Sequence, residues 1–403
     1  MFTAKHIKDG KMLIKGVTKF IHYKRDILSE EKLDAIRKKQ TAFKELLRTG
    51  TKEEVREKAK ELQKVCERSL PMPTMPGVRE NVEVFFVAIV IALGIRSYFL
   101  QPFKIPTGSM QPTLNGIIAQ GYSEQEETKW KEVEPNILVK GWDLLWRGRN
   151  YVDVTAKEDF TISKIYQKNW LKFFSFTYIE RRGIRGEKLK PIRIWSPILQ
   201  TVNDLGLRNH LSGARQGKAA DGTPVFSVNG AGIKAGTVLA RGYVDTGDQV
   251  LVNKFSYHFR NPTRGEVFVF TTQGIELIEE RNGNTNSQHY IKRLVGVPGD
   301  RFEVKPPELH INGVRATESG INRVMERQDG YTGYVLSPRK MSPKRESFGM
   351  NSGKLPPREY MAMGDNSPNS WDSRGWGTVK EKNLVGPALF VYWPFGAHWG
   401  LID

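Results

Sequence analysis

VFFVAIVIALGI (residues 84–95) is the most apolar run of the chain, twelve uncharged residues between Glu83 and Arg96. Twelve residues are too few to span a bilayer and would suit a buried core helix equally well. Extension to Leu100 reaches the length that a span needs, if Arg96 extends its charged end toward a head group. We therefore predict a transmembrane helix over residues 82–100. A secretory signal peptide is not expected, because some eighty residues precede the run.

The segment before this run is basic, with 20 Lys and Arg against 12 Asp and Glu over residues 1–80. A positive flank beside a single span predicts that this end stays in the cytoplasm. Apolar residues at helical spacing predict two helices, the second opened by a capping box of Thr51 and Glu54. We predict a basic helical hairpin and a Pro-rich linker over residues 1–76. Nucleic-acid binding is not expected there, because no arginines alternate with aromatic residues.

The composition of the whole chain sets limits on its class. It has 403 residues, 39% of them hydrophobic and 26% charged, with a formal net charge of +18. These values exclude a disordered tail and a polytopic carrier, and the positive charge suggests an anionic neighbour, either nucleic acid or an acidic membrane surface. A single cysteine, Cys66, excludes an internal disulfide framework and a multi-cysteine zinc site.

The sequence after Leu100 is typical of β-structure. Short β-branched and aromatic runs such as residues 266–270 and 384–392 alternate with Gly, Pro and Asn, and all nine tryptophans lie on this side. We predict a β-rich domain over residues 101–115 and 242–403. Residues 116–241 are predicted to be an inserted module of unknown role.

Common catalytic signatures are missing: the chain contains no H-E-x-x-H, no G-x-S-x-G and no Walker-type loop. The first of three unusual segments is QPFKIPTGSMQPTL (residues 101–114). Its Pro-Thr-Gly turn would present Ser109 on a tight, exposed bend, with backbone N–H groups nearby to hold an oxyanion. Taken alone, the segment is more typical of a Pro-rich linker.

The other two segments lie far downstream. YIKRLVGVPGD (residues 290–300) predicts a strand that ends in a turn, and a Lys292 that pointed into the core would lose its proton readily, although neighbouring Lys and Arg are usually solvated. MGDNSPNSWDSR (residues 363–374) is a dense polar loop. By itself it would suit an Asx-rich turn or a calcium loop, but its acids do not have EF-hand spacing.

Together and in this order, the three segments resemble those of type I signal peptidases, the membrane-bound leader peptidases of bacteria. GDQVLVNK (residues 247–254), followed by RGEVFVF (residues 264–270), is a fourth similar segment. The resemblance covers residues 80–116 and 242–395. It implies a mostly β catalytic domain of antiparallel sheets, joined to an N-terminal α-helical cytosolic segment and one transmembrane helix.

The resemblance also implies roles for individual residues. Ser109 would be the acylated nucleophile and Lys292 the general base, whose pKa must fall from about 10.4 to near neutrality through burial. Thr107 and the Ser109 N–H would hold the oxyanion, and Ser370 would orient the lysine amine. The wall beside this dyad would be shaped by Gly364, Asp365, Asp372 and Arg374. Pockets for small signal-peptide residues would be lined by Phe103, Ile105, Pro106, Met110, Leu114, Tyr290 and Ile291.

The function implied is removal of signal peptides from exported preproteins, without metal or cofactor. The expected location is the bacterial cytoplasmic (inner) membrane, as a single-pass protein whose catalytic domain lies outside, near the translocation machinery. We also expect exposed aromatic residues, including Trp393 and Trp399, to contact lipid. Two alternatives remain: a peptidase of the same family dedicated to one substrate, and a non-catalytic membrane scaffold.

Overall fold

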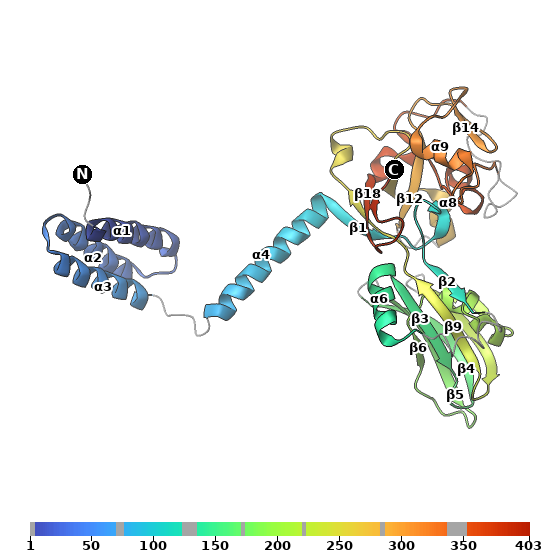
Figure 1. The fold of residues 1–403 in the computed structure, drawn as a ribbon, viewed down its shortest axis with the longest axis horizontal. Helices are drawn as coiled ribbons and strands as arrows, with labels where there is room; N and C mark the ends of the chain where they lie inside the picture. Colours follow the sequence, from blue (N-terminus) through green and yellow to red (C-terminus); the bar gives the residue numbers. More distant parts are fainter. Residues whose placement is uncertain are drawn as a thin grey trace. The chain divides into compact units, whose positions relative to one another are not determined.

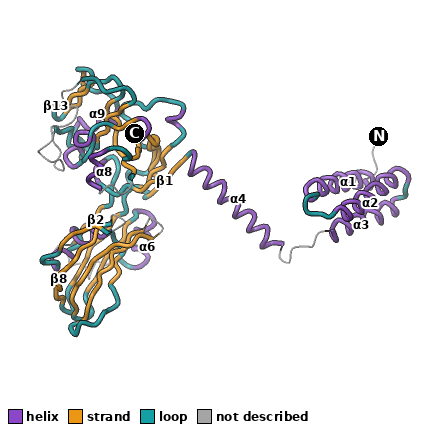
Figure 2. Tube along the Cα trace, turned by 180° about the vertical axis from the view of Figure 1, so that it is seen from behind, coloured by secondary structure: helices purple, strands orange, loops and turns teal. Residues whose placement is uncertain are grey.

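The structure, a computed structural model, describes residues 5–69, 76–122, 135–170, 174–219, 223–282, 287–336 and 353–403. The chain divides into two units, Met1–Ala92 and Leu93–Asp403 (Figure 1). Figure 2 shows the described residues before α4 as helices and loops, whereas strands predominate after it. Part of the predicted Pro-rich linker, residues 70–75, lies outside the described residues.

Three helices pack around one apolar core in the N-terminal unit: α1 (Lys5–Lys24), α2 (Glu30–Thr49) and α3 (Lys52–Ser69). The Thr51 N–H donates to the Glu54 carboxylate (2.8 Å) before α3, as a capping box requires. The predicted hairpin corresponds to α2 and α3. It is incomplete, because Val17 of α1 is buried in the same core as Phe43 and Leu62.

The apolar run lies in α4 (Pro76–Tyr98), which continues almost directly into strand β1 (Leu100–Lys104). Residues Glu80–Tyr98 are long and apolar enough to cross a membrane, and they form the one such helix in the described part of the chain. None of that stretch is buried within the protein. Within the described residues this stretch of α4 is therefore not packed as a core helix would be.

An antiparallel eight-stranded sheet follows α4. In spatial order its strands are β1, β10 (Gln249–Asn253), β18 (Leu384–Trp393), β11 (Val267–Thr271), β12 (His289–Gly296), β16 (Glu359–Met363) and β17 (Val379–Lys380), with β19 (Gly400–Leu401) beside β18. Val267 and Val269 enter one core cluster, while Phe268 and Phe270 enter another. The sheet is therefore covered on both faces, as the continuous apolar run of β11 requires.

A smaller sheet of β13 (Phe302–Lys305), β14 (Glu308–Ile311) and β15 (Val314–Arg315) shares a core with helix α9 (Ser319–Glu326). Two further short helices are α8 (Glu276–Asn282) and α10 (Ser373–Trp376). The described structure is thus mostly β after α4, which confirms that part of the predicted fold class.

Two more antiparallel sheets lie between β1 and β10 in the sequence. One contains β2 (Ile118–Gly121), β9 (Val238–Asp245) and β3 (Arg149–Thr155). The other contains β6 (Ile192–Ile194), β5 (Phe174–Gly183), β4 (Phe160–Trp170), β8 (Pro224–Ile233) and β7 (Arg215–Lys218). Helices α6 (Ile137–Arg147) and α7 (Ile198–Asn203) accompany them. The two sheets and α7 contribute side chains to a separate apolar core that includes Phe160, Ile179 and Leu239.

Candidate functional site

Ser109 lies on a short 3-10 turn, Gly108–Met110, that follows β1. Thr107 is extended before the turn, and the Gln111 N–H closes it on the Gly108 carbonyl (3.3 Å). The side chain of Met110 has no exposed surface and fixes the turn to the core. Gly116 packs directly against the residue before the turn, since any side chain at Gly116 would overlap the Thr107 carbonyl. Ser109 is thus held on a rigid bend.

Lys292 lies in the middle of β12, opposite Phe268 of β11, and its side chain is buried. Its Nζ is 2.6 Å from Ser109 Oγ and also donates to the Ile291 carbonyl (3.0 Å). The Tyr290 ring centre is 5.8 Å from the same nitrogen. Burial disfavours the charged form of an amine, so this setting suits a lysine that accepts a proton.

The sheet curves so that its first and fifth strands meet at the site. The rings of Phe103 on β1 and His289 on β12 lie 5.0 Å apart. This contact brings β1 close to β12, although the two strands are not hydrogen-bonded neighbours in the sheet. The curvature explains how a turn after β1 reaches a lysine on β12.

Asn366 connects the polar loop to the turn that carries Ser109. Its backbone N–H donates to the Ser109 carbonyl (3.1 Å), and its Nδ2 donates to the Gly108 carbonyl (2.9 Å). Gly364 lies equally close, because a Cβ there would overlap the Ser109 carbonyl and Ser370 Oγ. Asn366 is absent from the predicted site residues. Its position in the 363–374 segment could have suggested a role at the site. The sequence does not show, however, that the Gly108 and Ser109 carbonyls lie within its reach.

Arg293, the residue after Lys292, forms a buried ion pair with Asp365. Nε and Nη2 of Arg293 lie 2.9 and 2.7 Å from the two carboxylate oxygens, and neither side chain is exposed. Asp365 also accepts a hydrogen bond from the Thr113 hydroxyl, which itself contacts the Tyr331 hydroxyl at 2.9 Å. Burial lowers the pKa of Arg293, but the Asp365 charge outweighs it and the pKa is raised, so the arginine stays charged.

Asp372 and Arg374 form a second buried pair in the polar loop. Arg374 donates through Nε (2.8 Å) and Nη2 (2.6 Å) to the carboxylate, and Asp372 also accepts the Gly364 N–H (3.0 Å). Burial raises the pKa of Asp372, but the Arg374 charge and these hydrogen bonds outweigh it and hold the pKa below its ordinary value. Ser370 is fully buried beside Gly364.

The residues predicted to line the substrate pockets fall into two groups. Those buried in one core cluster are Ile105, Met110, Leu114 and Ile291. Phe103 and Tyr290 are half-buried, and Pro106 is exposed. Only the second group offers substantial surface to a ligand in this conformation. Among the described residues, no cluster of three His, Cys, Asp or Glu could hold a metal ion.

Comparison with known proteins places this geometry in a family. The family model for signal peptidase, peptidase S26, matches residues 78–126 and 240–393. The chain belongs to the signal peptidase family. The predicted resemblance to type I signal peptidases is therefore confirmed.

Individual signal peptidases are similar over the same part of the chain. Signal peptidase I of Leptolyngbya laminosa is 29% identical over 49% of this chain and 76% of its own length. Signal peptidase I of Bacillus amyloliquefaciens is 32% identical over 37% of this chain and 68% of its own length. Thylakoidal processing peptidase 1 of Arabidopsis thaliana is 30% identical over 38% of each chain. A solved signal peptidase I from Enterococcus faecalis V583 is 26% identical, covers 32% of this chain and 97% of its own, and superposes with a TM-score of 0.23.

Membership of the signal peptidase family supports a serine peptidase that removes signal peptides. The two matched stretches include α4, the Ser109 turn, β12 and the polar loop. They leave out residues 127–239, which contain α6 and the five-stranded sheet. That part of the chain has no explanation in the family model.

Proposed function

We propose that this protein is a membrane-bound serine endopeptidase that removes signal peptides from exported preproteins through a Ser109 acyl-enzyme. The observation that carries the proposal is the 2.6 Å distance between Ser109 Oγ and Lys292 Nζ in a buried setting. A serine hydroxyl needs an adjacent base to attack a peptide bond. A lysine amine can replace the His-Asp pair of other serine proteases in that role.

The reaction has two halves. Neutral Lys292 takes the Ser109 proton as Oγ bonds to the scissile carbonyl carbon, and the resulting oxyanion accepts hydrogen bonds from the Ser109 N–H and the Thr107 hydroxyl. Lys292 then gives its proton to the leaving amine, and the peptide C–N bond breaks. In the second half, Lys292 takes a proton from water, hydroxide attacks the ester, and the proton returns to Ser109. Ser370 would orient the amine throughout.

Selection of the cleavage site would be steric. Phe103, Pro106 and Tyr290 present the surface on which the signal peptide would lie, and the buried side chains of Ile105, Met110, Leu114 and Ile291 form the wall behind it. A rigid apolar wall rejects large side chains and admits small ones, which suits residues such as alanine at −1 and −3 of the cleavage site.

The chain would be organised around the bilayer. The predicted span of residues 82–100 would end at Tyr98, because Leu100 already belongs to β1. Residues 1–76 would lie in the cytoplasm because of their basic charge. Residues 101–115 and 242–403 would form the peptidase domain on the outer side of a bacterial cytoplasmic membrane, near the translocation machinery, and residues 116–241 an inserted module. The exposed apolar length of α4 supports this arrangement.

The test is cleavage of a preprotein by the full chain in detergent. We expect Ser109→Ala and Lys292→Ala each to reduce the rate by at least about a thousandfold, because each removes a reacting group. Lys305→Ala, on the exposed side of β13, is the matched control and should leave the rate unchanged. Cleavage by Ser109→Ala at the wild-type rate would overturn the proposal.

Two other functions give different results in the same assay. A non-catalytic scaffold would show no cleavage that depends on Ser109 or Lys292. A peptidase dedicated to one substrate, such as a conjugation or pilus precursor, would process that precursor and few others, which a survey of preproteins would reveal.

A further inference from the structure

Helix α6 of the inserted module carries its apolar residues on the outside. Ile137, Leu138 and Trp142 are 84%, 80% and 58% exposed, and Leu145 and Trp146 are exposed as well. The buried side chain is the acid Asp143, which accepts a hydrogen bond from the Tyr151 hydroxyl (2.7 Å). The helix packs on β3, the strand that carries Tyr151 (Figure 1). This is the reverse of a helix that packs its apolar face on a core.

The helix is well formed. The Asn136 side chain accepts the Val139 N–H (2.9 Å) at its beginning, and Gly148 ends it in a left-handed conformation with φ of 65°. A fixed helix with an outward apolar face implies something apolar outside the described chain that covers it.

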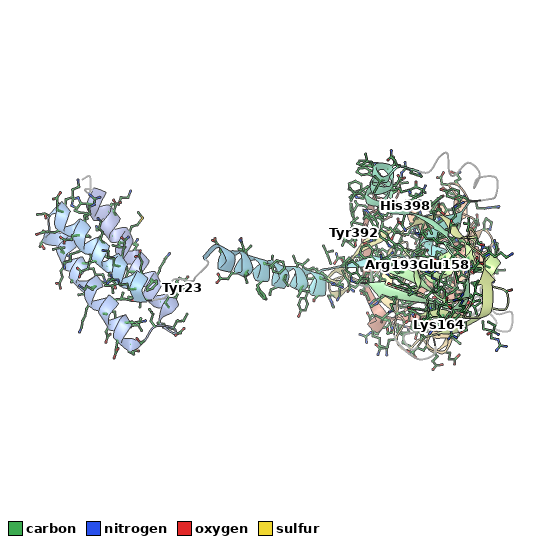
Figure 3. The ribbon with its side chains drawn as sticks, turned by 90° about the horizontal axis from the view of Figure 1, so that it is seen from below. Tyr23, Glu158, Lys164, Arg193, Tyr392 and His398 are labelled. Carbon is green, nitrogen blue, oxygen red and sulfur yellow. The ribbon has the colours of Figure 1, made fainter. Side chains whose placement is uncertain are left out.

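The apolar surface continues from α6 onto the loop between β18 and β19 of the peptidase sheet. Trp142 stacks on Trp146 with 5.3 Å between ring centres, Trp146 contacts Phe395 at 5.2 Å, and Phe395 contacts Trp399 at 6.2 Å. Trp399 is itself 52% exposed. An open apolar pocket of about 1040 Å³ adjoins this row, and its lining includes Leu145, Tyr392 and Phe395. Tyr392 is labelled in Figure 3.

We propose that α6 is an interfacial helix that holds the catalytic unit on the surface of the phospholipid bilayer. A row of tryptophan and leucine beside basic residues, here Lys140 and Arg147 on the same helix, is the composition of helices that lie in the head-group region. Trp399 would supply one lipid contact from the peptidase domain. Helix α6 would add a second contact, from the part of the chain outside the family match.

The connection to α4 favours a bilayer over a protein partner. β1 begins at Leu100, directly after α4 ends, and β1, β10 and β18 are neighbours in the sheet. At the end of β18, the Trp393 indole N–H donates to the Leu145 carbonyl of α6 (2.7 Å). Trp393 pairs with Gln249, which pairs with Lys104 at the far end of β1. The strand bonded to α6 is therefore two strand spacings, about 10 Å, from β1, and the contact lies about 13 Å along the strands from Leu100. The inference thus rests on the membrane anchor in the proposed function.

The experiment measures lipid contact directly and does not depend on catalysis. The full chain with Cys66→Ser and Ser109→Ala receives one new cysteine, Leu138→Cys or Ile184→Cys, labelled with an environment-sensitive fluorophore. Ile184 is the matched control, an isoleucine of the same module that is 76% exposed. In phosphatidylcholine–phosphatidylglycerol vesicles with spin-labelled acyl chains, we expect quenching at 138 to exceed quenching at 184 by at least about threefold, since interfacial helices reach the acyl chains.

Equal quenching at the two positions would overturn the proposal. So would a probe at 138 that is shielded from water without being quenched by lipid, because that result indicates a protein partner. Failure of the proposed peptidase function would instead appear as absent cleavage in detergent, where α6 has no bilayer to contact.

A second variant tests the consequence for activity. Ile137→Asp with Leu138→Asp places acids in the first turn of α6, where the helix dipole favours them, so the helix should persist. We expect about tenfold slower preprotein cleavage in vesicles and unchanged cleavage in detergent, with Ile184→Asp unaffected in both. Unchanged cleavage in vesicles would contradict a role for α6 in holding the site at the bilayer.

Discussion

Arg293 and Asp365 form a two-point ion pair with no exposed surface, and the pair connects the two strands of the sheet nearest the dyad. Arg293 follows Lys292 on β12, and Asp365 lies just after β16. Through the Thr113 hydroxyl, Asp365 also contacts the segment that carries Ser109. One carboxylate thus fixes the position of the nucleophile relative to its base.

We expect Asp365→Asn to reduce the free energy of unfolding by about 3–5 kcal/mol, because it leaves the Arg293 charge buried and uncompensated. The measurement is urea unfolding of the full chain in detergent. Glu381→Gln, which breaks the exposed pair with Arg358, is the control and should cost less than about 1 kcal/mol. Equal losses for the two variants would show that the buried pair is not a major constraint.

Asn366 is expected to act as a positioning residue. Asn366→Ala removes the Nδ2 hydrogen bond to the Gly108 carbonyl and leaves the backbone bond to Ser109 in place. The looser turn should lower kcat by about tenfold and change KM by less than about twofold, since orientation affects the chemical step. Steady-state kinetics on a preprotein distinguish this from a binding role, in which KM would rise alone. Asn261→Ala, at an exposed position, serves as the control.

Gly364 has no room for a side chain. The added methyl of Gly364→Ala would overlap both the Ser109 carbonyl and Ser370 Oγ, and one of them must move. A displacement near 1 Å at a reacting group costs about a hundredfold in rate, so cleavage should fall by that order. Gly217→Ala on β7, where nothing lies within 4 Å of the new methyl, should be silent. Full activity of Gly364→Ala would mean that the turn tolerates such movement.

The Asp372 carboxylate makes stability depend on pH. Its pKa in the folded protein lies below the ordinary value of 3.8, so its stabilising effect is complete above that value and is lost as the pH falls below it. The thermal midpoint of the full chain should therefore decline below about pH 4. The Asp372→Asn variant should have a lower thermal midpoint than the wild type at pH 7, and its midpoint should fall less between pH 7 and low pH. An unchanged acid response in that variant would show that other carboxylates dominate it.

Local patterns were sufficient for some features of this protein. Twelve uncharged residues predict an apolar helix wherever they lie, and the β-branched and aromatic runs after it predict strands, because both signals depend on neighbours in sequence. The segments around Ser109, Lys292 and Asp372 indicated the family, and the family match confirms it. Helix α1 was not predicted, although Val17 and its apolar neighbours have helical spacing.

The tertiary structure alone decided how these segments meet. Ser109 and Lys292 are 183 positions apart, and only the curvature of the sheet, with Phe103 against His289, brings their side chains to 2.6 Å. Arg293 meets Asp365 because β12 pairs with β16, and the bonds of Asn366 then join the polar loop to the Ser109 turn. For α6, sequence gives an apolar stripe, but only the burial of Asp143 against Tyr151 shows that the stripe faces outward. Periodicity records which side chains share a face, whereas long-range packing determines what that face meets.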